Sequence, residues 1–219
     1  MIADHVASGP IVSPCRRRSH ASVRPNTESL ESRQLLTIAF QFDYSRDTHG
    51  FFNDTARRQI LELAGTTLGN RLDDQLLAIT PTPGSGNTWS LTTSNPSTDS
   101  TLTLNNQSIP KNTLLVFVGS RKDMSSLGFG GPGGYSSSGT QAWLNQVAAR
   151  GQTGALSNSA TDFGPWGGSI TFDNDANWYF GQSSSGLGAN QNDFFSTALH
   201  ELGHVLGIGT ADSWDRQAS

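Results

Sequence analysis

The chain has 219 residues, a formal net charge of −4 and 34% hydrophobic residues. This length allows one domain with a buried core, and no stretch of about 20 apolar residues is present, so we expect no membrane span. Residues 37–219 contain nine Lys or Arg against fifteen Asp or Glu, which leaves a net charge of −6. An acidic body without a basic patch argues against nucleic acid as a partner.

Residues 1–36 have no periodic apolar pattern and contain five arginines, three of them consecutive at Arg16–Arg18. We expect this segment to be a disordered leader. Within it, Leu-Glu-Ser-Arg-Gln-Leu-Leu at 30–36 resembles the L-E-x-R-x-L-L signature near the start of many exported proteins of one bacterial phylum. The resemblance implies export, to the cell surface or the extracellular space, and a mature domain that begins close to Thr37.

The first part of this domain predicts strands with one long helix among them. Residues 38–44 alternate apolar and polar side chains, as a half-buried strand does. Residues 54–72 have apolar positions with a 3.6-residue period behind Asp54, a good N-cap, so a helix is expected. The next predicted elements are a short strand at 76–80, a hairpin at 88–92 and 101–105, and a doubly covered strand at 112–119.

The second part contains the remaining helices. Residues 128–138 are dense in glycine, which predicts a loop, and no Gly-Lys-Ser/Thr follows, so the loop is not a phosphate-binding one. Residues 140–150 predict an amphipathic helix, 168–173 a short strand and 192–206 a final helix. This order of elements is typical of an α/β (α+β) domain with a twisted mixed sheet.

The final helix contains His200-Glu201-Leu202-Gly203-His204, an H-E-x-x-H pattern. Residues four apart lie on one helix face, about 6 Å apart, so both imidazoles can reach one zinc ion. Glu201 is placed to act on a zinc-bound water, whose pKa the metal lowers to about 7. These residues predict a metallopeptidase in which Glu201 is the general base.

A simpler interpretation is an amphipathic helix with two surface histidines. The surrounding residues favour the metal site instead. Asp193 can cap the helix, and Gly207 can end it directly after the second histidine. A broad apolar face can bury the helix against a sheet; it consists of Phe194, Phe195, Ala198, Leu199, Leu202, Val205 and Leu206.

Two segments occur in an order that is similar to the matrixins, metzincin zinc peptidases of the zincin group. They are Gly-Gly-Ser-Ile-Thr-Phe-Asp-Asn-Asp-Ala-Asn-Trp at 167–178 and Ala-Leu-His-Glu-Leu-Gly-His-Val-Leu-Gly at 198–207. The resemblance covers roughly residues 37–214. It implies a zincin-type catalytic N-terminal subdomain, in which a twisted mixed sheet has an antiparallel edge strand and packs on two helices.

In that family the first segment is the edge strand that pairs with the peptide substrate, followed by a calcium loop. The resemblance implies that substrate adds a strand beside Ser169, Ile170, Thr171 and Phe172. Thr171 stands where matrixins have a structural-zinc histidine, which argues against a second zinc site. Ala176 replaces an acid of the calcium loop, so Asp173 and Asp175 are left as Ca²⁺ ligands or as part of a solvated turn.

The third zinc ligand departs further from the family. Metzincins place a His or Asp where this chain has Thr210. The segment Gly207-Ile208-Gly209-Thr210 resembles leishmanolysin-like peptidases, whose third histidine follows an inserted segment. On this interpretation residues 37–219 lack the C-terminal subdomain, and the third ligand lies outside the chain. The alternative is that Asp212 is the third ligand.

These observations favour a secreted zinc endopeptidase that acts on protein or peptide substrates. One alternative is a non-catalytic secreted binding or adhesion module that keeps the zincin scaffold, which the Gly-, Ser- and Asn-rich loops would suit. Another keeps the zinc but acts as an exopeptidase or amidase. Zinc is the expected cofactor, and calcium is a second candidate ion.

Overall fold

A computed structural model describes residues 37–218. The chain divides into two units, Met1–Gln34 and Leu35–Ser219, and the described residues belong to the second. The predicted leader and the export-type segment at 30–36 lie outside the described residues.

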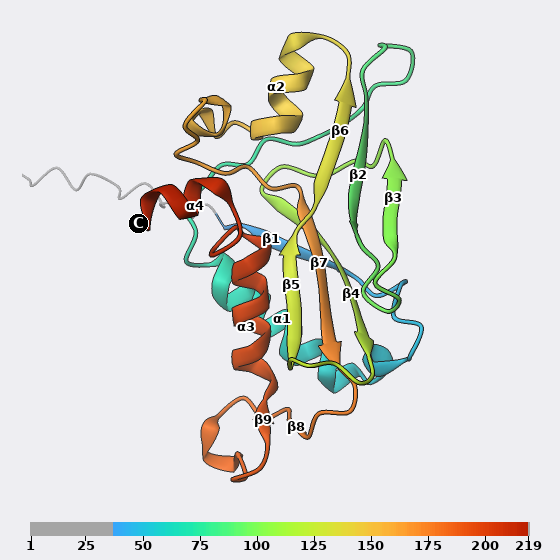
Figure 1. The fold of residues 1–219 in the computed structure, drawn as a ribbon, viewed down its shortest axis with the longest axis vertical. Helices are drawn as coiled ribbons and strands as arrows, with labels where there is room; N and C mark the ends of the chain where they lie inside the picture. Colours follow the sequence, from blue (N-terminus) through green and yellow to red (C-terminus); the bar gives the residue numbers. More distant parts are fainter. Residues whose placement is uncertain (1–36, 219) are drawn as a thin grey trace, which may run out of the picture. The chain divides into compact units, whose positions relative to one another are not determined.

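The domain contains both strands and helices (Figure 1). Its strands are β1 (Ala39–Asp43), β2 (Thr88–Ser94), β3 (Thr101–Asn105), β4 (Thr113–Arg121), β5 (Gly128–Pro132), β6 (Gly134–Ser138), β7 (Gly167–Asp173), β8 (Trp178–Tyr179) and β9 (Asn192–Asp193). Its helices are α1 (Thr55–Gly69), α2 (Gln141–Ala149), α3 (Phe194–Val205) and α4 (Asp212–Gln217), with 3₁₀ turns η1 (Phe51–Asn53), η2 (Thr153–Leu156) and η3 (Ser184–Gly186).

The main sheet has the strand order β1-β4-β7-β5. β4 runs parallel to β1 and β7, and β5 runs antiparallel to β7, with Gly130 opposite Ile170. The central strand β4 is buried almost throughout, because its apolar run is covered on both faces. The predicted mixed sheet with an antiparallel edge strand is therefore confirmed, and the edge strand is β5.

A second, antiparallel sheet has the order β3-β2-β6 and covers one face of the main sheet. The two sheets are joined by hydrogen bonds: the Thr93 hydroxyl donates to Ser169 Oγ at 3.0 Å, and the Thr171 hydroxyl donates to the Pro96 carbonyl at 3.0 Å. The core on this side of the main sheet includes residues of α2 and contains three tryptophans, namely Trp89, Trp143 and Trp166.

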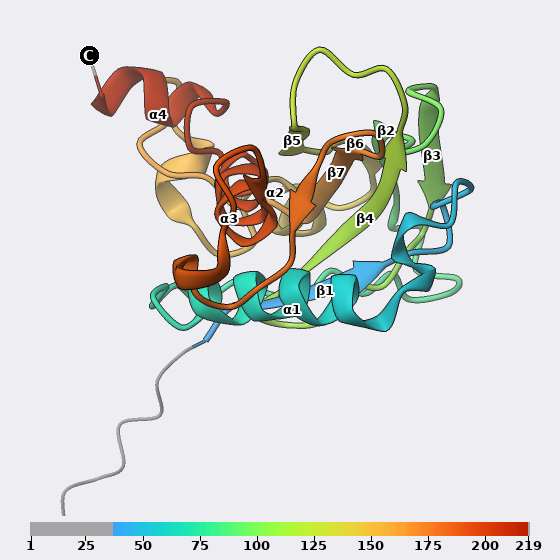
Figure 2. The same ribbon diagram turned by 90° about the horizontal axis from the view of Figure 1, so that it is seen from below.

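Helices α1 and α3 pack against each other and against the face of the main sheet opposite the second sheet (Figure 2). The core between them is aromatic: Phe52, Phe172 and Phe194 are fully buried, and the ring centroids of Phe172 and Phe194 are 4.6 Å apart. Among the described residues, no helix is long and apolar enough to cross a membrane.

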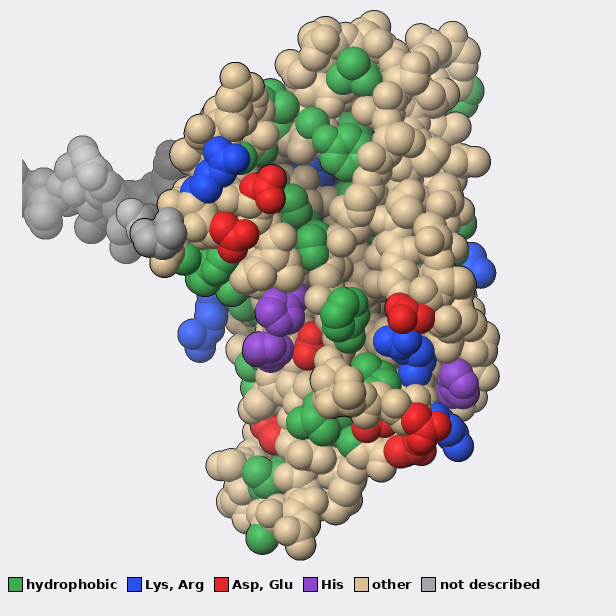
Figure 3. All heavy atoms as spheres, viewed as in Figure 1, with side chains coloured by type: hydrophobic (Ala, Val, Ile, Leu, Met, Phe, Trp, Pro, Cys, Tyr) green, Lys and Arg blue, Asp and Glu red, His purple; other side chains and the backbone are tan. Residues whose placement is uncertain are grey.

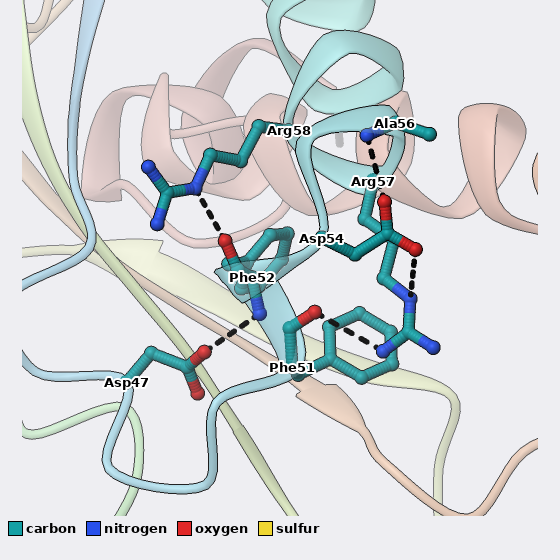
Figure 4. Close-up of polar contacts among 7 residues, drawn as sticks. All are labelled: Asp47, Phe51, Phe52, Asp54, Ala56, Arg57 and Arg58. Atoms are coloured by element: carbon teal, nitrogen blue, oxygen red, sulfur yellow. Dashed lines mark hydrogen bonds and ion pairs between the residues drawn. The ribbon is translucent and has the colours of Figure 1, made fainter.

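The entry into α1 is fixed by polar contacts around η1 (Figure 4). Asp54 caps the helix by accepting from the Ala56 N–H at 2.8 Å, as its place before the apolar period predicts. Asp47 accepts from the Phe52 N–H at 2.7 Å, and Arg57 donates to the Phe51 carbonyl at 3.1 Å. These bonds hold the two phenylalanines in the core.

Arg150 connects several loops from inside the protein. It is fully buried, follows α2 in a left-handed conformation with φ of 49°, and burial lowers its pKa to about 10. Its guanidinium donates to four backbone carbonyls, those of Leu77, Thr113, Pro165 and Pro110, at 2.8–2.9 Å. The charge is thus solvated by peptide dipoles of three separate segments, around residues 77, 110–113 and 165.

The glycine-dense segment differs from expectation. The prediction of a loop at 128–138 is wrong, because these residues form β5 and β6, two consecutive strands of different sheets. The predicted strand at 76–80 is reduced to one bridge between Ile79 and Ile109. The other predicted strands and helices are present, with ends shifted by a few residues.

A candidate metal centre on helix α3

Helix α3 presents the His-Glu-x-x-His pattern in a fixed orientation. Asp193 caps its start, and its carboxylate accepts from the Ser196 N–H at 3.2 Å. The side of α3 that faces the main sheet is completely buried and consists of Phe194, Ala198, Leu202 and Val205. This packing fixes the rotation of the helix, so that His200 is exposed and His204 is half-buried.

The turn after α3 is shaped by glycine. Gly207 has φ of 95°, its N–H donates to the His204 carbonyl at 3.0 Å, and the Ile208 N–H donates to the Gly203 carbonyl at 3.0 Å. This is a Schellman motif, which confirms the predicted helix end at Gly207. The motif also places the Ile208 carbonyl 2.8 Å from His204 Nδ1.

A carbonyl oxygen can only accept, so the bond to Ile208 places the His204 proton on Nδ1. In this tautomer the lone pair of His204 Nε2 faces His200 Nε2, and it is the atom that would bind a metal ion. The Nε2 atoms of His200 and His204 lie 3.0 Å apart, and their rings are nearly perpendicular at 88°. Figure 3 shows two histidine side chains side by side on the surface, with an acidic side chain next to them.

Glu201 lies against β5 and is only 5% exposed. Burial is the largest influence on its carboxyl group and raises the pKa. The charges of His200 and His204 and a backbone hydrogen bond from Gly130 act in the opposite direction. Glu201 is therefore a desolvated carboxyl group beside two imidazoles, a setting typical of functional sites.

Two glycines of β5 allow this close approach. A Cβ added to Gly128 would lie 2.9 Å from Glu201 Oε1, and one added to Gly130 would lie 2.5 Å from the Glu201 carbonyl oxygen. The predicted site residues did not include β5. A usable signal was present: glycines at 128 and 130 alternate with apolar residues at 127 and 129, which is the period of a strand.

The histidine pair fits a zinc ion. Two nitrogens bound tetrahedrally at about 2.0–2.1 Å from one zinc lie roughly 3.3 Å apart, close to the 3.0 Å observed between the Nε2 atoms. Within residues 37–218, however, no third His, Cys, Asp or Glu joins the pair in a group that could hold a metal. Asp212, the alternative third ligand, begins α4 instead, and His49 lies 2.8 Å from the Ser120 carbonyl.

The predicted substrate strand needs correction. Ser169, Ile170, Thr171 and Phe172 belong to β7, which is not an edge strand, because β4 pairs with it on one side and β5 on the other. All four side chains are buried. No substrate strand can pair with β7, and the free edge of this sheet nearest α3 belongs to β5.

Asp173 and Asp175 lie in the turn after β7. Asp173 accepts from the Asp175 N–H at 2.9 Å, and Asp175 accepts from the Asp123 N–H at 3.2 Å. These bonds suit a solvated turn, and the described residues contain no group of three acids around it that could hold a metal. Calcium binding at the two carboxylates stays a prediction.

Comparison with known proteins concerns the second half of the domain. Residues 142–216 match the family model for matrixin. The matched range begins within α2 and ends within α4, so it contains β7 and α3 but not β5. The similarity supports a metzincin-type zinc metallopeptidase family. No curated protein and no solved structure matches the chain.

Proposed function

We propose that this protein is a secreted zinc-dependent endopeptidase, in which His200 and His204 bind the metal and Glu201 is the general base. The observation that carries the proposal is the convergence of two Nε2 atoms, 3.0 Å apart, beside a buried carboxyl group. The matrixin match over 142–216 supports the same class of enzyme. Secretion rests on the export-type segment at 30–36 alone.

The roles of the residues follow from their surroundings. Zinc, when bound, polarises a carbonyl group and lowers the pKa of water. His204 is held in the metal-binding tautomer by the Ile208 carbonyl. Glu201 accepts a proton from the attacking water and later gives it to the leaving amine. Burial, which raises the pKa of Glu201, makes its carboxylate a stronger base for the first transfer.

The free edge of β5 is the place for an extended substrate. β5 is the outer strand of the main sheet, and its Gly128 and Gly130 approach Glu201. A peptide that adds a strand there would pass beside the catalytic carboxyl group. This replaces β7, on which the sequence resemblance had placed the substrate.

A catalytic zinc site has three protein ligands and one open position. Because the described residues supply two, we propose that the third ligand lies outside residues 37–218. A site with only two imidazoles would bind zinc weakly. The affinity of the protein for zinc therefore indicates whether a third ligand is present.

The main rival is a non-catalytic binding module on the same scaffold. It would keep the buried face of α3 but would have no need for the tautomer of His204 or for a desolvated carboxyl group at Glu201. If the protein is such a module, substitutions at His204 and Glu201 will change neither its metal content nor its rate of peptide hydrolysis.

Turnover and metal content of the Glu201→Gln variant separate the two functions. The full chain is loaded with zinc and incubated with a library of internally quenched peptides. We expect hydrolysis by the unchanged protein and a loss of about 10²- to 10⁴-fold in Glu201→Gln, because the general base is gone. Zinc content, measured by mass spectrometry, should be unchanged in this variant and lowered in His204→Ala.

His49→Ala is the matched control, since His49 lies beside Ser120 and away from the pair. It should keep both zinc and turnover. Full hydrolysis by Glu201→Gln would refute the role of the carboxyl group. Undiminished zinc in His204→Ala would refute the metal site.

A further inference from the structure

Strand β3 forms an outer edge of the second sheet. The order of that sheet is β3-β2-β6, so among the strands of the described residues β3 pairs with β2 alone. Figures 1 and 2 show it as the outermost strand, on the side of the domain away from α3. The backbone groups of β3 that do not face β2 therefore lie along an open edge, where a further strand can pair with them.

The hydrogen bonds at the two ends of the β2–β3 pair show which residues of β3 face outward. The Asn106 N–H donates to the Trp89 carbonyl at 2.8 Å. At the other end, the Asn95 N–H donates to the Ser100 carbonyl at 2.8 Å. Bonded and non-bonded positions alternate in an antiparallel pair, so the even-numbered residues from 100 to 106 bond to β2. The outward-pointing N–H and C=O groups belong to the odd-numbered residues, namely Thr101, Thr103 and Asn105.

The sequence of β3 suits pairing with a second copy of itself. Thr-Leu-Thr-Leu-Asn contains no charge and no proline, which are the features that usually protect an open edge. In an antiparallel pair with a two-fold axis at Thr103, each Thr101 lies opposite Asn105 of the second copy. Outward-pointing groups then meet outward-pointing groups at every odd position, and each such pair exchanges two hydrogen bonds. The Asn105 carbonyl, which accepts from the exposed Gln107 side chain at 3.3 Å, would change its donor.

The two leucines of β3 give this pair an apolar side. Leu102 and Leu104 are partly buried and pack against the core that contains Trp89 and Leu91. In the two-fold pair each Leu102 lies opposite Leu104 of the second copy, at the positions where side chains of antiparallel strands come closest. The apolar layer under one sheet thus continues under the other, and apolar surface leaves water.

We propose that the protein forms a symmetric dimer in which two β3 strands pair antiparallel about Thr103 and join the two second sheets into one. The contact is isologous, because the same edge serves both copies. A second copy is favoured over a free extended peptide, since its strand is already ordered and loses less conformational entropy on pairing. One strand pair buries little area, so the dissociation constant should be on the order of 10–100 µM.

Sedimentation velocity of the full chain tests the dimer. A reducing agent is present, so that Cys15 cannot cross-link two copies. Between about 5 µM and 500 µM, a range that brackets the expected constant, the weight-average sedimentation coefficient should rise from that of a monomer toward that of a dimer.

Amide hydrogen exchange, followed for each residue by NMR, tests the pairing. The N–H groups of Leu102 and Leu104 bond to β2 and should be protected at every concentration. Those of Thr101, Thr103 and Asn105 should exchange readily in the monomer. They should exchange about ten-fold more slowly once the protein is mostly dimeric, because the partner strand then binds them.

Thr103→Lys and Thr103→Glu test the two-fold axis. Like charges would face each other in either homodimer, so each variant alone should dimerise about five-fold more weakly than the unchanged protein. An equimolar mixture of the two should restore the dimer, because the charges are then opposite. Ser136→Lys is the matched control: it places the same charge on the same face of the sheet, but on β6, and should leave the dimer unchanged.

A chain that remains monomeric over the whole range would overturn the proposal. A dimer that leaves the odd-numbered amides unprotected, or that Thr103→Lys does not weaken, would show that another surface joins the copies and would also overturn it. A mixture of Thr103→Lys and Thr103→Glu that stays monomeric would refute the two-fold axis at Thr103. If a synthetic peptide of residues 99–107 protects the odd-numbered amides while the chain itself stays monomeric, the edge accepts an extended peptide and not a second copy.

Discussion

Glu201 combines two properties that a surface glutamate does not have: it is almost fully buried, and it lies next to two imidazoles on the same helix. Burial raises its pKa, and the neighbouring histidines lower it again. In the metal-free protein the carboxylate thus lacks full compensation for its lost hydration.

This arrangement predicts a pH-dependent stability of the metal-free protein. The folded-state pKa of Glu201 lies above its ordinary value of 4.5, so the folded state keeps the proton to higher pH than the unfolded state. The contribution of Glu201 to stability is present below pH 4.5 and is lost as the pH rises through the folded-state pKa.

Glu201→Gln removes this titration. With EDTA present, its melting temperature should equal that of the unchanged protein near pH 4.5 and exceed it at pH 7.5. Thermal unfolding followed by circular dichroism at both pH values measures the difference. If the melting temperature of Glu201→Gln, relative to that of the unchanged protein, falls from pH 4.5 to pH 7.5, the predicted direction of the pH dependence is wrong.

At the scale of elements, the contact of α3 with β5 builds the site. The helix approaches the strand so closely that any side chain at Gly130 would meet the backbone of Glu201. This requirement explains why the strand was missed in the sequence. Glycine has low strand propensity and marks turns in most contexts, whereas here it permits close packing of a helix.

Gly130→Ala and Gly131→Ala form a matched pair for this contact. The Cβ at 130 would lie 2.5 Å from the Glu201 carbonyl oxygen, so strand and helix must separate, at a cost of about 1–3 kcal/mol. The Cβ at 131 has open space, so stability should change by less than about 0.5 kcal/mol. Chemical denaturation measures both, and equal stabilities would refute the close contact.

Other elements could be predicted from the sequence because their capping residues and apolar periods agree with the structure around them. Asp54 and Asp193 cap α1 and α3 where the apolar periods begin, and Gly207 ends α3 as its left-handed conformation requires. The pairing of strands was less readable. β7 has the apolar sequence of either an edge or a central strand, and only the position of β5, far away in sequence, decides between them.

In the whole domain, the two sheets and the helical layer are connected by loops whose long-range contacts cannot be predicted from the sequence. Arg150 illustrates this, because a lone arginine after a helix predicts a solvated side chain, yet its guanidinium donates to four carbonyls from three separate segments. The fold class could be predicted from periodicity. The long-range partners of single polar residues could not.

The candidate site likewise combines features that the sequence predicts with features that depend on the tertiary structure. The H-E-x-x-H spacing identified the histidine pair and Glu201, since helix geometry alone brings residues four apart together. The tautomer of His204 depends on the Ile208 carbonyl, and the approach of β5 depends on its glycines. Both are tertiary features, and the third metal ligand is not placed beside the pair by the described residues.

X-ray absorption at the zinc edge of the full chain, loaded with one equivalent of zinc, tests the metal site most directly. We expect two imidazole nitrogens at about 2.0–2.1 Å, with the outer-shell scattering typical of histidine. In His204→Ala one imidazole should be lost, and in His49→Ala both should remain. A zinc shell without imidazole scattering, or one unaffected by His204→Ala, would contradict this expectation.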